Sequence, residues 1–220
     1  MNKKENSQLD KRKLFHAFFI PSIITILIFI SFIFEKGMDL DFHKAGVLPR
    51  SISHLWGIFT YVFVHSNWSH LLNNLLSFFV LSVTLYYFYN QIANKVLFFA
   101  YLSSGLILWL IGRENYHIGA SGLIYALVFF QFFSGLIRMH IPLIAISLVI
   151  AFLYGSFFWH LFPWQQNDPI SWEGHLSGGL SGLILSVVFR NSGPQKPLKD
   201  WGEEENEELE KDDDLTELLN

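Results

Sequence analysis

The sequence of 220 residues contains no cysteine. Without cysteine the chain can form neither a disulfide framework nor a thiolate metal site, and it is not a cysteine protease. Charged residues are scarce as well: Asp, Glu, Lys and Arg make up 15% of the chain, whereas 51% of the residues are hydrophobic and 17% are aromatic. A soluble domain usually carries about 25% charged residues, so this composition indicates a membrane protein.

The charges are concentrated at the two ends of the sequence. Residues 201–220 hold 10 of the 19 acidic residues and one of the 15 basic residues, and without them the net charge changes from −4 to +5. Beyond residue 190 the chain turns to Gly, Pro and acidic residues, which cannot bury enough apolar surface to fold alone. We therefore interpret residues 1–13 as a basic cytoplasmic N-terminus and residues 191–220 as an acidic, disordered cytoplasmic tail.

Six apolar segments are each long enough to cross a bilayer, whose core takes roughly 20 residues of helix. They cover approximately residues 14–34, 69–89, 95–111, 119–137, 141–163 and 172–189. Lys and Arg in short connections stay on the cytoplasmic side, and an N-terminus on that side places ten of them inside against four outside. We predict an all-α, polytopic protein of the cell membrane, with six spans and both termini in the cytoplasm.

The second, fourth and sixth segments begin on the same side of the membrane under this topology, and each carries polar side chains near its start. These are His70 and Asn74, Ser121, and His175. Polar groups at membrane depth are costly unless they face the interior of the bundle, so their convergence predicts a site. His70 and Asn74 are four residues apart, share a helix face and can both donate hydrogen bonds to one point. The alternative is that this pair ties its helix to a neighbour.

Gly119-Ala120-Ser121-Gly122 opens the fourth segment. A serine at a helix start commonly serves only as the N-cap. The flanking glycines, however, let another backbone approach closely, and the free N–H groups at a helix start favour a negative charge. The string is therefore also compatible with a nucleophile beside an oxyanion site.

His175 falls within the first two turns of the sixth segment, because Asp168-Pro169 and Ser171 are typical helix start signals. Glycine recurs every fourth residue along this helix, at Gly174, Gly178 and Gly182. Gly122 and Ala126 have the same spacing on the fourth segment, so the two helices can pack at short distance and bring Ser121 and His175 within hydrogen-bond reach. The alternative is a lone histidine that is hydrogen-bonded at a helix junction.

The three strings together resemble the rhomboid family of intramembrane serine proteases. They are His65-x4-His70-x3-Asn74, Gly119-Ala120-Ser121-Gly122-x2-Tyr125-Ala126 and His175-x2-Gly178-x3-Gly182. The resemblance covers residues 14–190, implies a six-helix rhomboid-like bundle, and implies hydrolysis of peptide bonds in or near the transmembrane segments of other membrane proteins. The partners it implies are those substrates and the lipid bilayer, with no nucleic acid, no metal and no cofactor.

The resemblance also assigns roles to individual residues. Ser121 is expected to be the nucleophile and His175 the general base, in a pair that lacks the carboxylate of a serine triad. His70, Asn74 and the backbone N–H of Ser121 are expected to stabilise the oxyanion, at about 3 kcal/mol per donor. Tyr125 is expected to pack on the imidazole, Gly119 to keep the backbone clear for substrate, and Gly122 belongs to the same motif. His65 lies in the loop or at the helix start, and this position favours a structural hydrogen bond to the loop backbone over a role in catalysis.

One position departs from the family pattern. Many rhomboids carry Trp-Arg in the first outer loop, where this sequence has Trp56-Gly57, which puts the stability of that loop in doubt.

Three other functions are considered as alternatives. The nearest alternative is a rhomboid-like pseudoprotease that binds membrane proteins for quality control. A transporter or channel would be expected to have ionisable residues within its spans or an inverted repeat, and the sequence shows neither. Other membrane proteases need a His-Glu-x-x-His string or an Asp within a span, which are absent as well.

Overall fold

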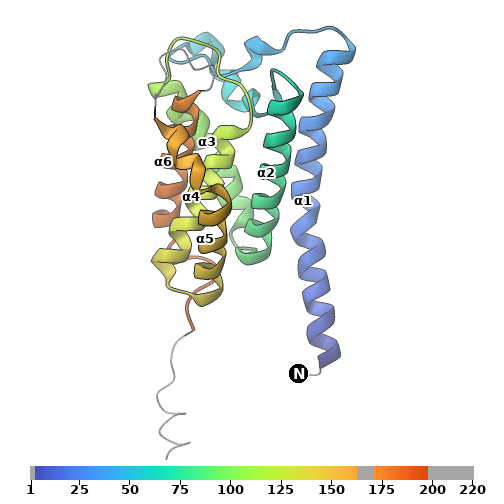
Figure 1. Ribbon diagram of the computed structural model, residues 1–220, viewed down its shortest axis with the longest axis vertical. Helices are drawn as coiled ribbons and strands as arrows, with labels where there is room; N and C mark the ends of the chain where they lie inside the picture. The colour runs from blue at the N-terminus through green and yellow to red at the C-terminus, as the bar shows by residue number, and fades with distance from the viewer. Residues whose placement is uncertain (1–2, 163–170, 198–220) are drawn as a thin grey trace, which may run out of the picture.

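The computed structural model describes residues 3–162 and 171–197, which form a bundle of six α-helices (Figure 1). The helices are α1 (Lys3–Gly37), α2 (Trp68–Phe88), α3 (Ala93–Ile111), α4 (Ser121–Arg138), α5 (Ile141–Tyr154) and α6 (Trp172–Val188). Four short 3-10 helices join them: η1 (His43–Ala45), η2 (Ile52–Phe59), η3 (Tyr61–Phe63) and η4 (Gly155–Leu161). The predicted all-α membrane architecture is confirmed. Most of the predicted acidic tail, residues 198–220, lies outside the described residues.

Five helical segments of the described chain are long and apolar enough to cross a membrane. They are Lys11–Gly37, Trp68–Phe88, Ala93–Ile111, Ser121–Arg138 and Ile141–Leu161. α6 contains 17 residues, which rise about 26 Å and lie at the short end of the usual range for a membrane helix. The predicted second, third, fourth and sixth segments match the observed helices to within two residues. By contrast, α1 extends beyond both predicted ends, from Lys3 to Gly37, and the predicted fifth segment ends nine residues after α5.

α4 occupies the centre of the bundle, and α1 lies at its edge against α2 (Figure 1). Two thirds of the apolar window of α4 is buried inside the protein, compared with 22% for α1. The interior contains a polar tie between α2 and α4: the Gln131 side-chain amide donates to the carbonyl of Leu81 at 3.0 Å and accepts from Thr84 Oγ1 at 2.7 Å. Such hydrogen bonds hold helices together where no hydrophobic force acts between them.

The predicted fifth span is not one continuous α-helix. It ends as an α-helix at Tyr154 and continues from Gly155 as η4. Glycine has poor helix propensity, and the carbonyls of the following residues are used by other helices. The hydroxyl of Tyr125 donates to the carbonyl of Phe157 at 3.0 Å, and His175 Nδ1 lies 3.0 Å from the carbonyl oxygen of His160. Contacts with α4 and α6 therefore replace the regular helical pattern here.

α2, α4 and α6 begin at one end of the bundle, which we call the site end. The connection between α1 and α2, residues 38–67, folds over this end together with the loop between α3 and α4, residues 112–120. Backbone hydrogen bonds of 2.9 Å in both directions join Val47 to His117. Gly57 lies where this connection crosses itself, and a Cβ there would overlap the carbonyl oxygen of Gly46. The glycine at the departure from the family pattern is thus required by a close backbone contact.

Candidate active site

Along the glycine stripe of α6, the backbone of α6 approaches the backbone of α4 closely. A Cβ at Gly178 would overlap the carbonyl oxygen of Gly122, and a Cβ at Gly182 would overlap that of Ala126. At the site end, a Cβ at Gly122 would lie 3.2 Å from the carbonyl oxygen of Gly174. The glycine stripe predicted from the sequence therefore packs against the small residues of α4, as expected.

His175 lies against the first turn of α4. The residue is 7% exposed, and its ring stacks on the ring of Tyr125, with centroids 4.2 Å apart and an angle of 9° between the planes. Nδ1 lies 3.0 Å from the carbonyl oxygen of His160. A carbonyl only accepts hydrogen bonds, so Nδ1 is the donor, and the neutral ring keeps its lone pair on Nε2. The ring is thus held in the tautomer whose other nitrogen can take a proton.

Ser121 is the first residue of α4 and is half-buried. The N-cap of this helix is Ala120, with no side-chain cap hydrogen bond, so Ser121 does not serve as the cap. Tyr125, which carries the stacked imidazole of His175, is one turn further along the same helix. The structure therefore places Ser121 and His175 at the same end of the α4–α6 interface.

The polar pair on α2 faces the loop immediately before Ser121. Gly119 has a positive φ of 99°, and a Cβ there would lie 2.5 Å from His70 Nε2 and 3.3 Å from Asn74 Nδ2. His70 Nδ1 lies 3.2 Å from Ser66 Oγ, which leaves Nε2 directed at Gly119. Side chains from α2 and the start of α4 thus converge, as the sequence predicted, and only glycine fits between them.

His65 is buried behind this pair. Its Nε2 accepts a hydrogen bond of 3.0 Å from Asn74 Nδ2, and its ring centroid lies 4.9 Å from that of His70. Burial, and next the neighbouring His70, lower the pKa of His65 to about 3, so the ring is neutral and can accept. The sequence predicted a structural hydrogen bond from His65 to the loop backbone. The loop backbone at Phe63 does contact the ring, and Nε2 in addition reaches a side chain of α2.

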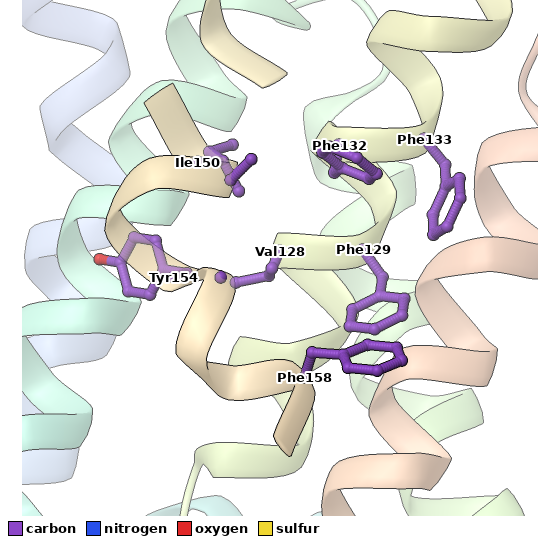
Figure 2. A pocket seen from close by; sticks show the side chains of 9 residues that line it. Val128, Phe129, Phe132, Phe133, Ile150, Tyr154 and Phe158 are labelled. Carbon is purple, nitrogen blue, oxygen red and sulfur yellow. The ribbon is translucent and has the colours of Figure 1, made fainter. Parts of the chain in front are cut away.

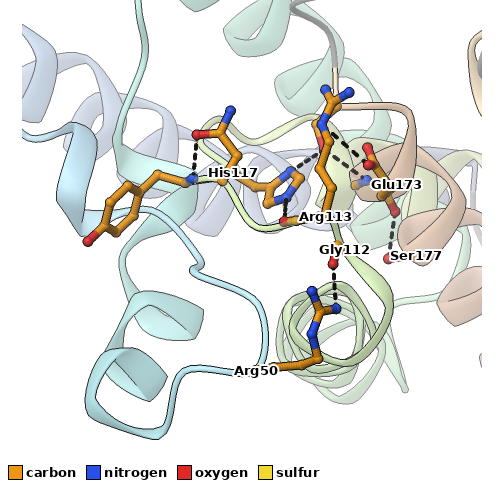
Figure 3. A network of polar contacts seen from close by, with 10 residues as sticks. Arg50, Gly112, Arg113, His117, Glu173 and Ser177 are labelled. Atoms are coloured by element: carbon orange, nitrogen blue, oxygen red, sulfur yellow. Dashed lines mark hydrogen bonds and ion pairs between the residues drawn. The ribbon is translucent and has the colours of Figure 1, made fainter. Parts of the chain in front are cut away.

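A polar network at the start of α6 was not predicted from the sequence (Figure 3). The guanidinium of Arg113 in the α3–α4 loop lies 3.4 Å from the carboxylate of Glu173, which is 2% exposed. Arg50 donates to the carbonyl of Gly112 at 2.6 Å. His117 contacts Ser171, the N-cap of α6. Of this network, the sequence predicted only Ser171 as a start signal of the helix, because a contact between two loops leaves no periodic pattern. The other predicted start signal, Asp168-Pro169, lies outside the described residues.

A cavity of about 250 Å³ lies between α4 and the α5–η4 segment, but it is unsuited to chemistry (Figure 2). Its lining is almost entirely aliphatic and aromatic, with Phe129, Phe132, Phe133 and Phe158 among the side chains. Nor does the described part of the chain contain three or more metal-ligating side chains grouped closely enough to hold an ion. The polar groups at the site end, rather than this cavity, are therefore the candidate active site.

Comparison with known proteins agrees with this architecture. The model of the Rhomboid domain matches residues 53–192. An uncharacterized protein of Mycobacterium tuberculosis is 31% identical over 194 residues, which cover 80% of this chain and 77% of the relative. Rhomboid-related protein 2 of Mus musculus is 25% identical over 162 residues, covering 69% of this chain and 54% of that protein. Rhomboid-related protein 1 of Caenorhabditis elegans is 24% identical over 152 residues, covering 64% and 41%, respectively. With more than half of its length matched by the family model, the chain is a multi-pass membrane protein that belongs to the rhomboid family.

Proposed function

We propose that the protein is an intramembrane serine protease that cleaves other membrane proteins in or near their transmembrane helices. The observation that carries the proposal is the placement of His175. Its ring stacks on Tyr125 one turn from Ser121, and its Nδ1 is fixed by the carbonyl of His160. A general base needs a fixed orientation and a ring nitrogen that can take a proton, and the hydrogen bond of Nδ1 gives His175 the tautomer in which Nε2 can do so.

In the proposed reaction, Ser121 Oγ attacks the carbonyl carbon of the scissile peptide bond while His175 Nε2 takes the hydroxyl proton. The tetrahedral intermediate collapses when His175 returns that proton to the leaving amine, and an acyl-enzyme remains. Water then attacks the ester carbon, gives its proton to His175 and releases the carboxylic acid with Ser121 restored. Each step balances in protons without an external group.

Negative charge on the tetrahedral oxygen needs donors that are already in place. His70 Nε2 and Asn74 Nδ2 both face Gly119, two residues before Ser121, and the backbone N–H of Ser121 is at the start of α4, where the helix dipole is positive. Each such donor contributes about 3 kcal/mol in comparable sites. The arrangement supports an oxyanion site made by α2 and the first turn of α4.

The substrate helix must unwind locally to reach this site, because its backbone is shielded by its own hydrogen bonds. Gly, Ala or Ser near the cut should favour cleavage. The bias of Lys and Arg supports an orientation with both termini in the cytoplasm of the cell and the site end on the outer side of the cell membrane. Since the chain has no cysteine, single cysteines introduced at residues 50 and 196 and reacted with an impermeant maleimide test this orientation without background.

The function is tested with purified protein in detergent and a model transmembrane substrate. Wild type should cleave it, and Ser121→Ala and His175→Ala should lower the rate by about 10³-fold or more. The control is Ser186→Ala, because Ser186 is fully buried near the other end of α6 and donates to Leu183 of its own helix. A fluorophosphonate probe should label the wild type at Ser121. Binding of the substrate without cleavage or labelling would instead identify a pseudoprotease.

A further inference from the structure

His117 makes directed hydrogen bonds through both nitrogens of its ring. The residue is 4% exposed, Nε2 lies 3.1 Å from the carbonyl oxygen of Arg113, and Nδ1 lies 2.6 Å from Ser171 Oγ. The carbonyl only accepts, so Nε2 donates, and the neutral ring accepts the hydroxyl proton of Ser171 at Nδ1. Burial lowers the pKa of His117, which agrees with a neutral ring.

Ser171 connects this ring to the start of α6. Its Oγ accepts the backbone N–H of Gly174 at 3.0 Å, and its carbonyl accepts the backbone N–H of His175 at 3.2 Å. The hydrogen bonds therefore run in one direction, from the Gly174 N–H to Ser171, from the Ser171 hydroxyl to His117, and from His117 to Arg113. Each donor in this series has one acceptor, so Ser171, the N-cap of α6, is fixed to the α3–α4 loop.

The two residues occupy equivalent places relative to the proposed dyad. His117 precedes Ser121 by four residues, and Ser171 precedes His175 by four residues. On the other side of the dyad, α4 and α6 touch where a Cβ at Gly178 would overlap the carbonyl oxygen of Gly122. The proposed dyad thus lies between two contacts: the His117–Ser171 hydrogen bond, which precedes it along both segments, and the Gly122–Gly178 backbone contact, which follows it.

A second contact joins the same two segments. Arg113 reaches the carboxylate of Glu173 from the α3–α4 loop (Figure 3). Glu173 is in the first turn of α6, where the helix dipole stabilises a negative charge, and its backbone carbonyl accepts from Ser177 at 2.6 Å. The ion pair also holds the start of α6 near the loop, at 3.4 Å, and the His117–Ser171 hydrogen bond is the shorter of the two contacts at 2.6 Å.

We propose that His117 and Ser171 are positioning residues, whose hydrogen bond sets the separation of the nucleophile Ser121 and the base His175 before substrate binds. The proposal rests on the proposed protease function. Neither residue touches the reacting atoms. Each acts through the residue four positions further along the chain, so its loss should slow the chemical step and leave the binding of a transmembrane substrate unchanged.

The central variant is His117→Phe, which keeps a ring in the buried position, removes both nitrogens and leaves the cap at Ser171 intact. We expect kcat to fall by about 10- to 100-fold, the range for misplacing a catalytic group by up to 1 Å, with KM changed by less than about twofold. The rate of fluorophosphonate labelling at Ser121 should fall in parallel. His117→Asn, whose amide oxygen can occupy the place of Nδ1, should recover part of the lost kcat.

His54→Phe is the matched control, because it makes the same change in the connection between α1 and α2, where the ring contacts Ser51 and Tyr116. It should cleave at the wild-type rate. A second arm compares Ser171→Ala with the double variant His117→Phe/Ser171→Ala. Since both changes break the same bond, the double variant should be no slower than the slower single variant.

The outcomes separate this proposal from the function on which it rests. If Ser121→Ala cleaves like wild type, the protease assignment fails. If Ser121→Ala is inactive but folded His117→Phe keeps the wild-type kcat, or the two single losses add fully in the double variant, the positioning role is overturned. Should His117→Phe not fold, the comparison of Ser171→Ala with Ser171→Thr, which retains the hydroxyl, decides the matter: equal kcat values refute the proposal, and recovery in Ser171→Thr supports it.

Discussion

Adjacent glycines of α6 offer a stringent test of whether the α4–α6 contact governs activity. Gly178 and Gly179 are both buried in the same helix. A Cβ at Gly179 would lie 3.4 Å from the nearest ring carbon of Phe129 and 3.6 Å from Leu161, which is ordinary van der Waals contact. A Cβ at Gly178 would overlap the carbonyl oxygen of Gly122 and lie 2.9 Å from Tyr125 Cβ. The same methyl group is therefore tolerated at one position and excluded at the next.

The magnitudes follow from these contacts. Alanine is favoured over glycine within a helix by about 1 kcal/mol, and this gain applies to both variants. Gly178→Ala in addition must move two backbones apart by on the order of 1 Å, and overpacking of this kind costs about 1–3 kcal/mol. The two variants should differ in unfolding free energy by that amount. A 1 Å displacement at the dyad costs about 100-fold in rate, so we expect kcat of Gly178→Ala to fall by that factor.

The assay is cleavage of a model transmembrane substrate by both variants, with thermal unfolding measured in the same detergent. Gly179→Ala should cleave like the wild type and unfold at the same or a higher temperature. Gly178→Ala should remain folded yet cleave slowly, because its methyl group meets the residue on which the His175 ring stacks. Equal rates for the two alanine variants would show that the close contact does not position the dyad.

Two further predictions concern the groups around the proposed oxyanion site. Gly119→Ala should lower kcat by about 10²- to 10³-fold, as for the loss of a donor, since its methyl group would lie 2.5 Å from His70 Nε2 and its φ of 99° is strained for alanine; a normal kcat in steady-state kinetics would contradict this. His65 should make stability depend on pH: its folded pKa of about 3 lies below the unfolded value of about 6.5, so the unfolded state binds the proton first and unfolding free energy is lost as pH falls from about 6.5 to about 3. The loss should reach about 2 kcal/mol at pH 5, and thermal unfolding of His65→Asn between pH 7 and pH 5 should show a flatter dependence.

The helices could be predicted from the sequence because a lipid bilayer restricts the backbone structures that can cross it. Every backbone group in hydrocarbon must be hydrogen-bonded within the segment, so a run of roughly 20 apolar residues is a helix. The same rule explains why the polar residues of α2, α4 and α6 could be assigned to the bundle interior before the fold was known. Gly178 and Gly182 were informative for a different reason, since small residues at a spacing of four on two helices predict a close contact between them.

The contacts of the loops could not be predicted in this way. His117 and Ser171 are 54 residues apart, and neither lies in a periodic pattern. From the sequence, Gly57 could be recognised only as a departure from the family pattern. Glycine is required there because the backbone of Gly46 lies close to it, and the sequence does not predict that contact. Local rules describe what one segment does on its own, whereas these positions depend on two segments meeting.

The change from α-helix to 3-10 helix at Gly155 shows why local prediction fails near the candidate site. A continuous α-helix would direct its carbonyls along its own axis, where they accept from the residues four positions on. In η4, instead, the carbonyl of Phe157 accepts from Tyr125 and that of His160 accepts from His175. A serine triad uses a carboxylate to fix the tautomer of its histidine, and here a backbone carbonyl makes that contact. Under the proposed mechanism the irregular segment is therefore part of the catalytic arrangement, because regular geometry would withdraw the carbonyl that fixes His175 in the tautomer whose Nε2 can take a proton.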